Sequence, residues 1–250
     1  MLTSKPSRTK PRRDSADLAR AREAIISCDR CPRLRTYCQR IATEKKAAHR
    51  ADTYWGRPVP GFGDPQARVL VIGLAPAAHG ANRTGRVFTG DGPLGSGDFL
   101  MRAMHAHGFA SIPTAQAADD GLVLTDAFIA AAVRCAPPDN KPTPAEIAAC
   151  HDHLVADVAA LPRVSMLIGL GRIGFVAAWR LLAGRGIIVR PRPAFAHDAA
   201  YEAGGYTVIA SYHPSRQNTN TGRLTPRMMD AVFARARRQL SARSCRLRKC

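Results

Sequence analysis

The chain has 250 residues, enough for one large domain or two small ones, and 46% of them are apolar, as in an ordinary soluble globular protein. No apolar run reaches the length of a membrane span, and the basic amino terminus lacks the apolar stretch of a secretory signal, so we expect a cytoplasmic protein without membrane contact. The formal net charge of +18, from 37 basic and 19 acidic residues, favours a polyanionic partner, DNA or RNA before an anionic membrane.

The amino-terminal part of the chain predicts two helices that flank a pair of cysteines. Residues 1–13 combine Lys, Arg, Pro and Ser without an apolar period, which predicts a disordered basic arm. Residues 14–27 carry apolar side chains at helical spacing after a capping Asp or Ser, and a second, polar helix is predicted over 38–50. Residues 54–65 are rich in Gly and Pro, which predicts an irregular loop.

The remainder of the chain alternates short apolar runs with amphipathic segments. The apolar runs predict buried strands at residues 68–74, 128–134, 164–170 and 206–211. The amphipathic segments predict helices at residues 95–108, 142–161, 173–182 and 225–240. This alternation predicts an α/β fold, a three-layer αβα sandwich with a central four-stranded parallel sheet and an amino-terminal, cysteine-bearing helical extension. We expect one domain over residues 14–240, followed by a basic tail at 241–250.

The cysteines suggest a metal centre. Seven cysteines are an odd count in a chain without an export signal, so ligation is favoured over a disulfide framework. Cys28 and Cys31 form a C-x2-C pair, and Cys135 and Cys150 lie much later, separated by fourteen residues. Four thiolates suit a zinc ion or a four-iron cluster. The wide second spacing suits the bulkier centre, but spacing alone leaves a cluster, zinc and no metal open.

The other three cysteines, Cys38, Cys245 and Cys250, fall outside this pattern. We expect the last two to be unpaired surface thiols of the basic tail.

Two polar loops follow predicted strands and form the candidate site. The stretch 69–91 leaves its strand through small residues and carries Asn82, Phe88 and Asp91, while His213 opens a polar loop after the fourth strand. Carboxyl ends of parallel strands meet at one edge of a sheet, where α/β proteins bind ligands. A plain strand-to-helix connection is the alternative. Several arginines near these loops are candidates for contacting a polyanion: Arg83, Arg86, Arg134, Arg190, Arg192, Arg216 and Arg223.

The segment Gly169-Leu-Gly171-Arg-Ile-Gly174 matches the dinucleotide-binding pattern G-x-G-x-x-G. However, no acidic residue lies about twenty positions later to hold a ribose, and Arg190 and Arg192 lie there instead. The glycines are better explained by close packing of a helix on a strand. A nicotinamide-dependent oxidoreductase is therefore the least favoured of three functional hypotheses.

Three longer segments resemble one known family. They are GLAPAAHGANRTGRVFTGD (73–91), AAVRCAPPDNKPTP (131–144) and HPSRQNTNTGRLTP (213–226). Together with the four cysteines they are similar to the uracil-DNA glycosylase superfamily, and most similar to its iron–sulfur type b branch, often called family 5. The resemblance runs from about Cys28 to Leu240. It implies a [4Fe-4S] cluster on Cys28, Cys31, Cys135 and Cys150, and removal of uracil and other deaminated or adducted bases, such as hypoxanthine, from DNA.

The resemblance also implies roles for residues of the three segments. Phe88 matches the aromatic residue that stacks on the base, and His213 matches the histidine that we expect to donate to the base O2. The candidates for placing the hydrolytic water are Asn82, Asp91 and Asn140. The expected substrate contacts are Ala75, Pro76, Phe88, Ala131, Ser215, Arg216 and Gln217.

Two alanines depart from other branches of the superfamily. Ala75 stands where relatives carry a water-activating acid or amide, and Ala131 where they carry a base-reading Asn; both fit the type b branch and imply a roomier pocket. We expect a monofunctional glycosylase without lyase activity, acting as a monomer on uracil-containing DNA in the bacterial cytosol or nucleoid. The main alternative is a non-catalytic iron–sulfur module that only binds nucleic acid.

Overall fold

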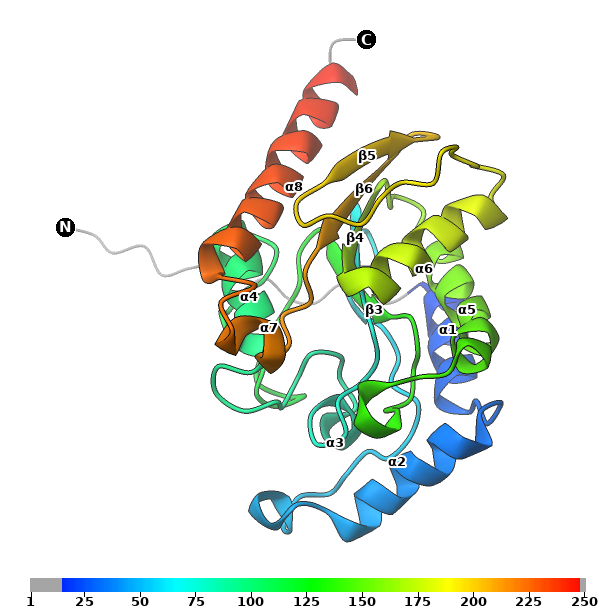
Figure 1. Cartoon of the computed structure of the whole chain (residues 1–250), viewed down its shortest axis with the longest axis vertical. Coiled ribbons are helices and arrows are strands. Elements are labelled where there is room, and N and C mark those ends of the chain that lie inside the picture. The colour runs from blue at the N-terminus through cyan, green and yellow to red at the C-terminus, as the bar shows by residue number, and fades with distance from the viewer. Residues whose placement is uncertain (1–14, 248–250) are drawn as a thin grey trace, which may run out of the picture.

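A mixed six-stranded sheet forms the centre of the computed structural model, which describes residues 15–247, without the side chains after residue 243 (Figure 1). The strand order is β1-β3-β2-β4-β6-β5. The four central strands are parallel to their neighbours: β2 (Val69–Gly73), β3 (Ala127–Ala131), β4 (Met166–Leu170) and β6 (Tyr206–Ser211). Antiparallel edges are added by β1 (Phe62–Gly63) and β5 (Ala200–Ala203).

The α/β class is therefore confirmed, and the predicted sheet of four parallel strands is corrected to a mixed sheet of six. The two edge strands escaped prediction for physical reasons. β1 comprises two residues inside a loop rich in Gly and Pro, and β5 alternates between exposed and half-buried residues, so neither forms an apolar run.

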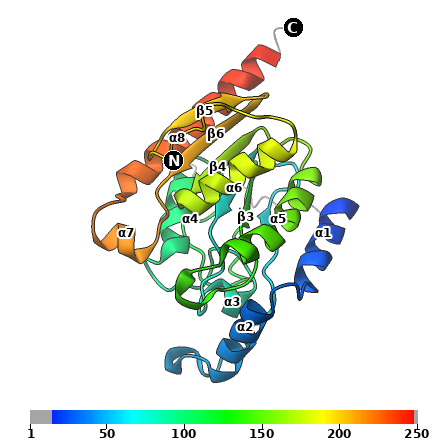
Figure 2. The ribbon, with the colours of Figure 1, turned by 45° about the vertical axis from the view of Figure 1, so that its right-hand side comes forward.

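Helices cover both faces of the sheet, as Figures 1 and 2 show. One face packs against α4 (Ser96–Ala106) and α8 (Pro226–Leu247), and the other against α1 (Ala16–Ile26), α5 (Pro144–Ala159) and α6 (Gly171–Gly184). Alternate residues of β2 point to opposite faces, Val69 and Val71 to the first and Leu70 and Ile72 to the second. Because all four are fully buried, β2 has the continuous apolar sequence of a strand covered on both sides.

The amino-terminal helices begin where local signals place them. α1 starts after Ser15, whose hydroxyl accepts a hydrogen bond from the backbone N–H of Leu18 (3.2 Å). The second helix, α2 (Pro32–Glu44), starts and ends about six residues before its predicted bounds, 38–50. A proline in the first turn favours this earlier start, since its missing N–H would have no helical partner there. A short 3-10 turn, η1 (Ala47–His49), follows.

The helix α5 begins at Pro144, two residues after the predicted bound, with Thr143 as its cap. The hydroxyl of Thr143 accepts from the backbone N–H of Glu146 (3.2 Å), and the Glu146 carboxylate accepts from the N–H of Thr143 (2.7 Å), which is a complete capping box. The closing helix α8 continues beyond its predicted end at residue 240 to Leu247. The predicted arm (1–13) and residues 248–250 of the predicted tail lie outside the described residues, as does the side chain of Cys245. Between residues 15 and 247, no helix has the length and apolar character required to cross a bilayer.

Close packing explains all three glycines of the G-x-G-x-x-G segment. A Cβ atom on Gly174 would lie 2.2 Å from the carbonyl oxygen of Ile72, and one on Gly169 would lie 2.5 Å from the backbone of Phe175. Gly171 has a φ of +75° and faces the Cβ of His213, 3.2 Å from where its own Cβ would be. The three glycines therefore bring α6 onto the sheet, as the packing explanation requires.

This packing generates a stability prediction. We expect Gly174→Ala to lower the free energy of unfolding by about 1–3 kcal/mol, because the added methyl group meets a backbone carbonyl that cannot move away. Gly184→Ala in the same helix is the matched control. Nothing lies within 4 Å of that position, and alanine favours a helix over glycine by up to about 1 kcal/mol. Urea unfolding measures both, and equal midpoints for the two variants would contradict the packing argument.

Candidate active site and cysteine pocket

The loops after β2, β3 and β6 all lie at the carboxyl ends of the central strands, which form one edge of the sheet because these strands are parallel to one another or to a shared neighbour. Short helical turns that the sequence did not predict lie within these loops. They are α3 (Ala81–Thr84), η2 (Pro138–Asn140) and α7 (Arg216–Asn220). All three are at most five residues long, too short for a periodic apolar pattern, which is why they escaped prediction.

The rings of Phe88 and His213 stack at this edge. Their centroids are 5.7 Å apart and their planes are inclined by 29°. The ring of Phe88 lies directly over Gly73, the last residue of β2, where a Cβ would approach it to 2.7 Å. Phe88 has a φ of +51°, a conformation that side-chain-bearing residues adopt rarely and that is typical of functional sites. The structure thus brings together two residues that are 125 positions apart in the sequence.

The imidazole of His213 is held in its neutral form. Removal from water lowers the pKa of His213 to about 4, so the ring is unprotonated at neutral pH. Its backbone is fixed by the side-chain amide of Asn218, which donates to the carbonyl of His213 (2.8 Å). A neutral imidazole always carries one N–H donor. The group can therefore donate a hydrogen bond without first taking up a proton.

Asp91 is a half-buried carboxyl group at the same edge. Burial raises its pKa to about 6, against the opposing effect of Arg216 and Arg83. Gly80 makes room for it, because a Cβ there would lie 1.9 Å from a carboxylate oxygen of Asp91. Arg216 donates to the backbone carbonyl of Asp91 (2.9 Å), which joins the loop after β6 to the loop after β2.

The two asparagines predicted to handle water lie in different settings. Asn82 is fully buried, and its amide nitrogen donates to the carbonyls of Cys38 and Ala78 (3.3 Å each), tying α3 to α2. Its side-chain oxygen is buried and has no hydrogen-bond partner among the described residues. Asn140 is exposed in η2 with a φ of +57°. No contact recorded between residues 15 and 247 joins Asn140 to Phe88 or His213.

Three of the predicted substrate contacts are small or rigid residues beside the strands. Pro76 and Ala131 are buried, Ala131 as the last residue of β3. Ala75 is partly buried and packs, with Ala78, against a cluster that contains Cys38, Cys135 and Cys150. The first part of the loop after β2 therefore packs against the cysteine-containing cluster.

The other predicted contacts begin the turn α7. The hydroxyl of Ser215 accepts from the N–H of Asn218 (3.4 Å) and caps the turn. The side chains of Arg216 and Gln217 are exposed at its first positions. Ser215 thus has a structural partner, while Gln217 and most of Arg216 remain accessible to a ligand.

The four cysteines predicted as ligands line one pocket. Cys28 and Cys31 come from the α1–α2 connection, Cys135 from the loop after β3, and Cys150 from α5. Cys38 is buried beside this pocket, with its thiol 3.6 Å from the carbonyl of Ala136. Within residues 15–247, no three His, Cys, Asp or Glu side chains are placed as ligands of a metal ion.

Two further observations describe the electrostatics of this cysteine pocket. Burial raises the pKa of Cys150 to about 11, and the positive charge of Arg134 and its backbone N–H, which donates to the Cys150 sulfur (3.2 Å), act against that rise. The guanidinium of Arg30 lies 3.5 Å from the sulfur of Cys28. Positive charge therefore lies beside a buried thiol, Cys150, and beside a partly exposed one, Cys28.

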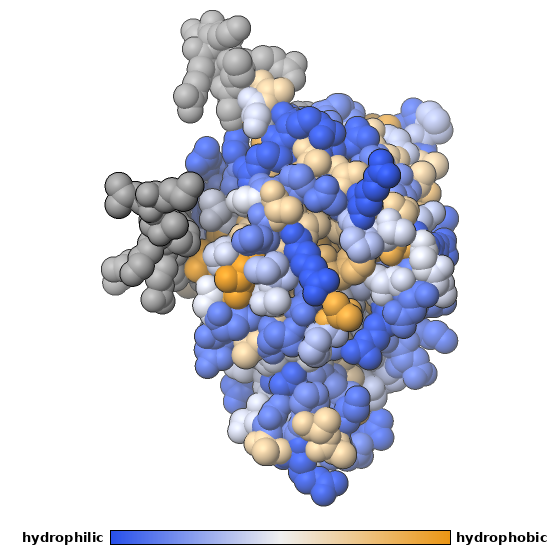
Figure 3. All heavy atoms as spheres, turned by 90° about the vertical axis from the view of Figure 1, so that its left-hand side faces the viewer, coloured by the Kyte–Doolittle hydropathy of each residue, from blue (hydrophilic) through white to orange (hydrophobic). Residues whose placement is uncertain are grey.

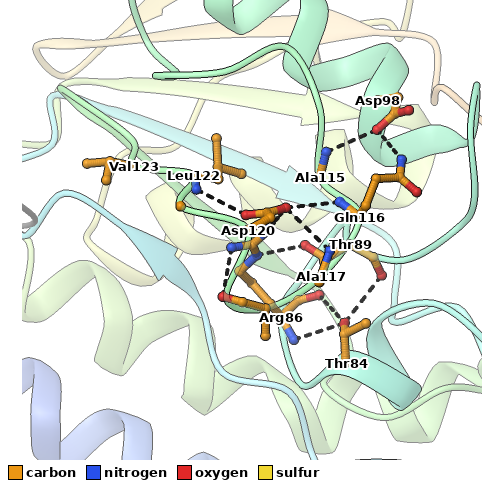
Figure 4. A network of polar contacts seen from close by, with 12 residues as sticks. Thr84, Arg86, Thr89, Asp98, Ala115, Gln116, Ala117, Asp120, Leu122 and Val123 are labelled. Atoms are coloured by element: carbon orange, nitrogen blue, oxygen red, sulfur yellow. Dashed lines mark hydrogen bonds and ion pairs between the residues drawn. The ribbon is translucent and has the colours of Figure 1, made fainter. Parts of the chain in front are cut away.

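A buried polar network supports the loop that carries Phe88 (Figure 4). Arg86 is only 6% exposed; it forms an ion pair with Asp120 (2.7 Å) and donates to the hydroxyl of Thr89 (2.9 Å) and the carbonyl of Ala118 (3.0 Å). The carboxylate of Asp120 also accepts from the backbone N–H groups of residues 116, 117 and 122. One ion pair thus joins the two loops and fixes the backbone on both sides of Phe88.

This network corrects the expected role of two arginines. Arg86 and Arg134 are buried, so neither is placed to contact a polyanion at the surface. Arg83 is also largely engaged inside the molecule, by Asp52 (2.7 Å) and two backbone carbonyls. The arginines that remain exposed are Arg190, Arg192, Arg216 and Arg223. Sequence reasoning also missed Asp120, since an acidic residue in a loop gives no sign of a buried partner.

Comparison with known proteins connects this site to a family. The model of the uracil DNA glycosylase superfamily matches residues 60–237, a span that contains all six strands, Phe88 and His213. A protein of Thermus thermophilus named type-5 uracil-DNA glycosylase is 48% identical over 217 residues, covering 86% of this chain and 95% of that protein. A protein of Mycobacterium tuberculosis with the same name is 45% identical over 218 residues, 86% of this chain and 79% of that protein. A type-4 uracil-DNA glycosylase of Pyrobaculum aerophilum is 29% identical over 171 residues, covering 68% of each chain.

The Arg86–Asp120 pair generates a prediction. We expect Arg86→Met to lower the free energy of unfolding by about 3 kcal/mol, because it leaves the Asp120 carboxylate buried without its counter-ion. Arg40→Met is the matched control, since Arg40 and Glu44 form an exposed pair at 3.7 Å whose loss changes stability by less than about 0.5 kcal/mol. Chemical denaturation compares the two variants, and similar small losses would show that the Arg86 network does not support the loop.

Proposed function

The chain belongs to the uracil DNA glycosylase superfamily, and we propose that it is a type-5, monofunctional glycosylase that hydrolyses the N-glycosidic bond of uracil in DNA and leaves an abasic site. The observation that carries this proposal is the pairing of the Phe88 ring with the neutral imidazole of His213 at the carboxyl edge of the sheet. The two groups match the two principal requirements of the reaction, a surface for the base and a donor for the leaving group.

Phe88 is the proposed stacking surface. A glycosylase extrudes the target nucleotide from the duplex, at a cost of a few kcal/mol, and recovers part of this by stacking the base against an aromatic side chain. The φ of +51° and the contact with Gly73 hold the Phe88 ring in place before a base arrives. Stacking therefore requires no rearrangement of the loop that the Arg86 network fixes.

His213 is the proposed donor to the departing base. As the glycosidic bond breaks, negative charge accumulates on uracil, and its O2 becomes a stronger acceptor. A donor that is already oriented towards this oxygen stabilises the transition state without reorganisation. Because His213 has a pKa of about 4, it donates as a neutral imidazole throughout the neutral range. Catalysis then depends on leaving-group stabilisation more than on a strong base.

Asp91 is our first candidate for orienting the hydrolytic water. With a pKa of about 6, the carboxyl group of Asp91 is ionised in most molecules at neutral pH and can accept a hydrogen bond from water. Asn140 stays a candidate because it is exposed and has no engaged side-chain partner among the described residues. Asn82 is the weaker candidate, since its donor is bound to two backbone carbonyls.

The base pocket would accept more than uracil. Ala75 and Ala131 place methyl groups where a base-reading amide or an acid would otherwise exclude other shapes. We therefore include hypoxanthine and other deaminated or adducted bases among the substrates. The exposed arginines, Arg190, Arg192 and Arg216 among them, supply positive charge for the phosphates of DNA. We expect a monomer in the cytoplasm, since one damaged base requires one site.

The cysteine pocket fits an iron–sulfur cluster. Its donor set is four thiols in a buried, arginine-lined setting, and thiolates are the ligands such clusters prefer. A four-iron cluster spreads its thiolate ligands further apart than one metal ion does, so its pocket need not resemble a single-ion site. Cys28, Cys31, Cys135 and Cys150 would hold it. When bound, the cluster would cross-link the amino-terminal helices to the loop after β3 and to α5, and it would add a group capable of electron transfer.

The main test of the function is base release from a duplex oligonucleotide with a single uracil. We expect His213→Ala to reduce the rate roughly 100- to 1000-fold, which is the usual effect of removing one transition-state donor. His105→Ala, an exposed histidine on α4, is the matched control and should not change the rate. If the wild-type protein binds this DNA but releases neither uracil nor hypoxanthine, the non-catalytic module is the better description.

The pKa of Asp91 generates a pH prediction. The ionised carboxylate is the form that accepts from water, so the rate of base release should fall as the pH drops through about 6 and the group is protonated. His213 does not contribute to this step, because it takes up a proton only near pH 4. A pH–rate profile of wild type and Asp91→Asn tests this: the variant should lose the step, and an unchanged step would assign it to another group.

The cluster has its own test. We expect the protein to contain about four iron and four sulfide per chain after anaerobic purification. Cys150→Ser should lose most of this iron, since it removes one ligand. Cys38→Ser is the matched control, a buried cysteine beside the same pocket that is not in the ligand set, and it should keep the iron. Equal iron contents in the two variants would contradict the assignment of the ligands.

A further inference from the structure

Arg134 is the largest of the fully buried side chains, with only 1% of its surface exposed. It immediately precedes Cys135, and it lines the same pocket as the four cysteines. One of its terminal nitrogens, Nη2, forms an ion pair with the buried carboxylate of Asp157. Its other two nitrogens, Nε and Nη1, are buried and have no hydrogen-bond partner among the described residues.

Two unpaired donors on one buried cation are unusual. Buried polar groups are almost always hydrogen-bonded, and guanidinium groups carry five N–H donors that all require acceptors. Asp157 satisfies one nitrogen only. A second arginine of the pocket shows the same pattern, since Arg35 donates through Nη2 to the carbonyl of Gly56 (3.1 Å) while its Nη1 is buried without a partner in the described part of the chain.

We propose that Arg134 is a positioning residue for the iron–sulfur cluster, and that Nε and Nη1 donate to cluster or thiolate sulfur atoms. The inference rests on the proposed cluster. A four-iron core bound by four thiolates carries a net negative charge. Hydrogen bonds to its sulfur atoms and nearby charges help to set the reduction potential of such a cluster. The guanidinium, which lines the same pocket and lowers the pKa of Cys150 by its positive charge, offsets this negative charge.

The competing explanation is that Arg134 serves only as the counter-ion of Asp157. This explains Nη2, but it leaves Nε and Nη1 without acceptors. The main chain adds a further contact with the cysteines, because the backbone N–H of Arg134 donates to the sulfur of Cys150 (3.2 Å). The residue therefore faces the thiols with its main chain as well as with its side chain.

The test separates these roles in a background where Asp157 needs no counter-ion. Asp157→Asn is compared with the double variant Arg134→Gln/Asp157→Asn, both purified anaerobically with iron and sulfide assayed. Two readouts follow: the rate of iron release to a ferrous chelator, and the iron–thiolate stretching bands in resonance Raman spectra. Arg134→Lys is a further variant that keeps a positive charge beside Asp157 but removes the fork. Arg33→Gln is the control, because Arg33 pairs with Glu146 and does not line the pocket.

We expect the double variant to release iron at least tenfold faster than Asp157→Asn, with its iron–thiolate bands shifted to higher frequency because the sulfurs lose hydrogen bonds. Arg134→Lys should show the same direction of shift, and Arg33→Gln should match wild type. Equal release rates and equal spectra in a cluster-bearing protein would overturn the role of Arg134 and leave the cluster standing. A wild-type protein without iron and sulfide would overturn both, while its uracil release would still decide the glycosylase activity.

Discussion

The close approach of one loop to the end of β2 is the constraint on which the site depends. β2 is buried on both faces and hydrogen-bonded to β3 and β4, so its direction is fixed, and the chain leaves it at Gly73. Phe88 reaches this point only because Gly73 has no side chain, and Asp91 reaches its own position only because Gly80 has none. Replacing either glycine would displace the Phe88 ring or the Asp91 carboxylate, because an added Cβ would lie 2.7 Å from the first and 1.9 Å from the second. The sheet therefore fixes where the loop begins, and the two glycines leave room for the Phe88 ring and the Asp91 carboxylate.

The elements with strong local signals were predictable from the sequence. The four central strands are continuous apolar runs, and α5 begins at a capping box whose two hydrogen bonds both form. The edge strand β5 and the turn α7 were not predictable, because the first is half exposed and the second is held by Ser215 and by Asn218 rather than by an apolar pattern. Such elements depend on contacts that form only once the sheet is assembled.

The site was predictable to the extent that motifs marked it. Phe88 and His213 were identified from the family's segments and the four cysteines from their spacing, and the structure brings each set together. The arginines were harder, because charge on a sequence does not indicate whether it is buried. Arg86 and Arg134 belong to internal networks, so part of the basic excess serves the fold. The partners that reveal this, Asp120 and Asp157, lie 34 and 23 positions away along the chain.

On the face drawn in Figure 3, polar residues predominate and apolar residues are scattered among them, as on the surface of most soluble proteins. Ala75 and Ala78 belong to the loop that leads from β2 to Phe88, and both pack against the cluster that contains Cys38, Cys135 and Cys150. Ala75 therefore has little room for a larger side chain on the side that faces this cluster. A larger residue at position 75 would disturb two regions at once, the loop that carries Phe88 and the packing around Cys135 and Cys150.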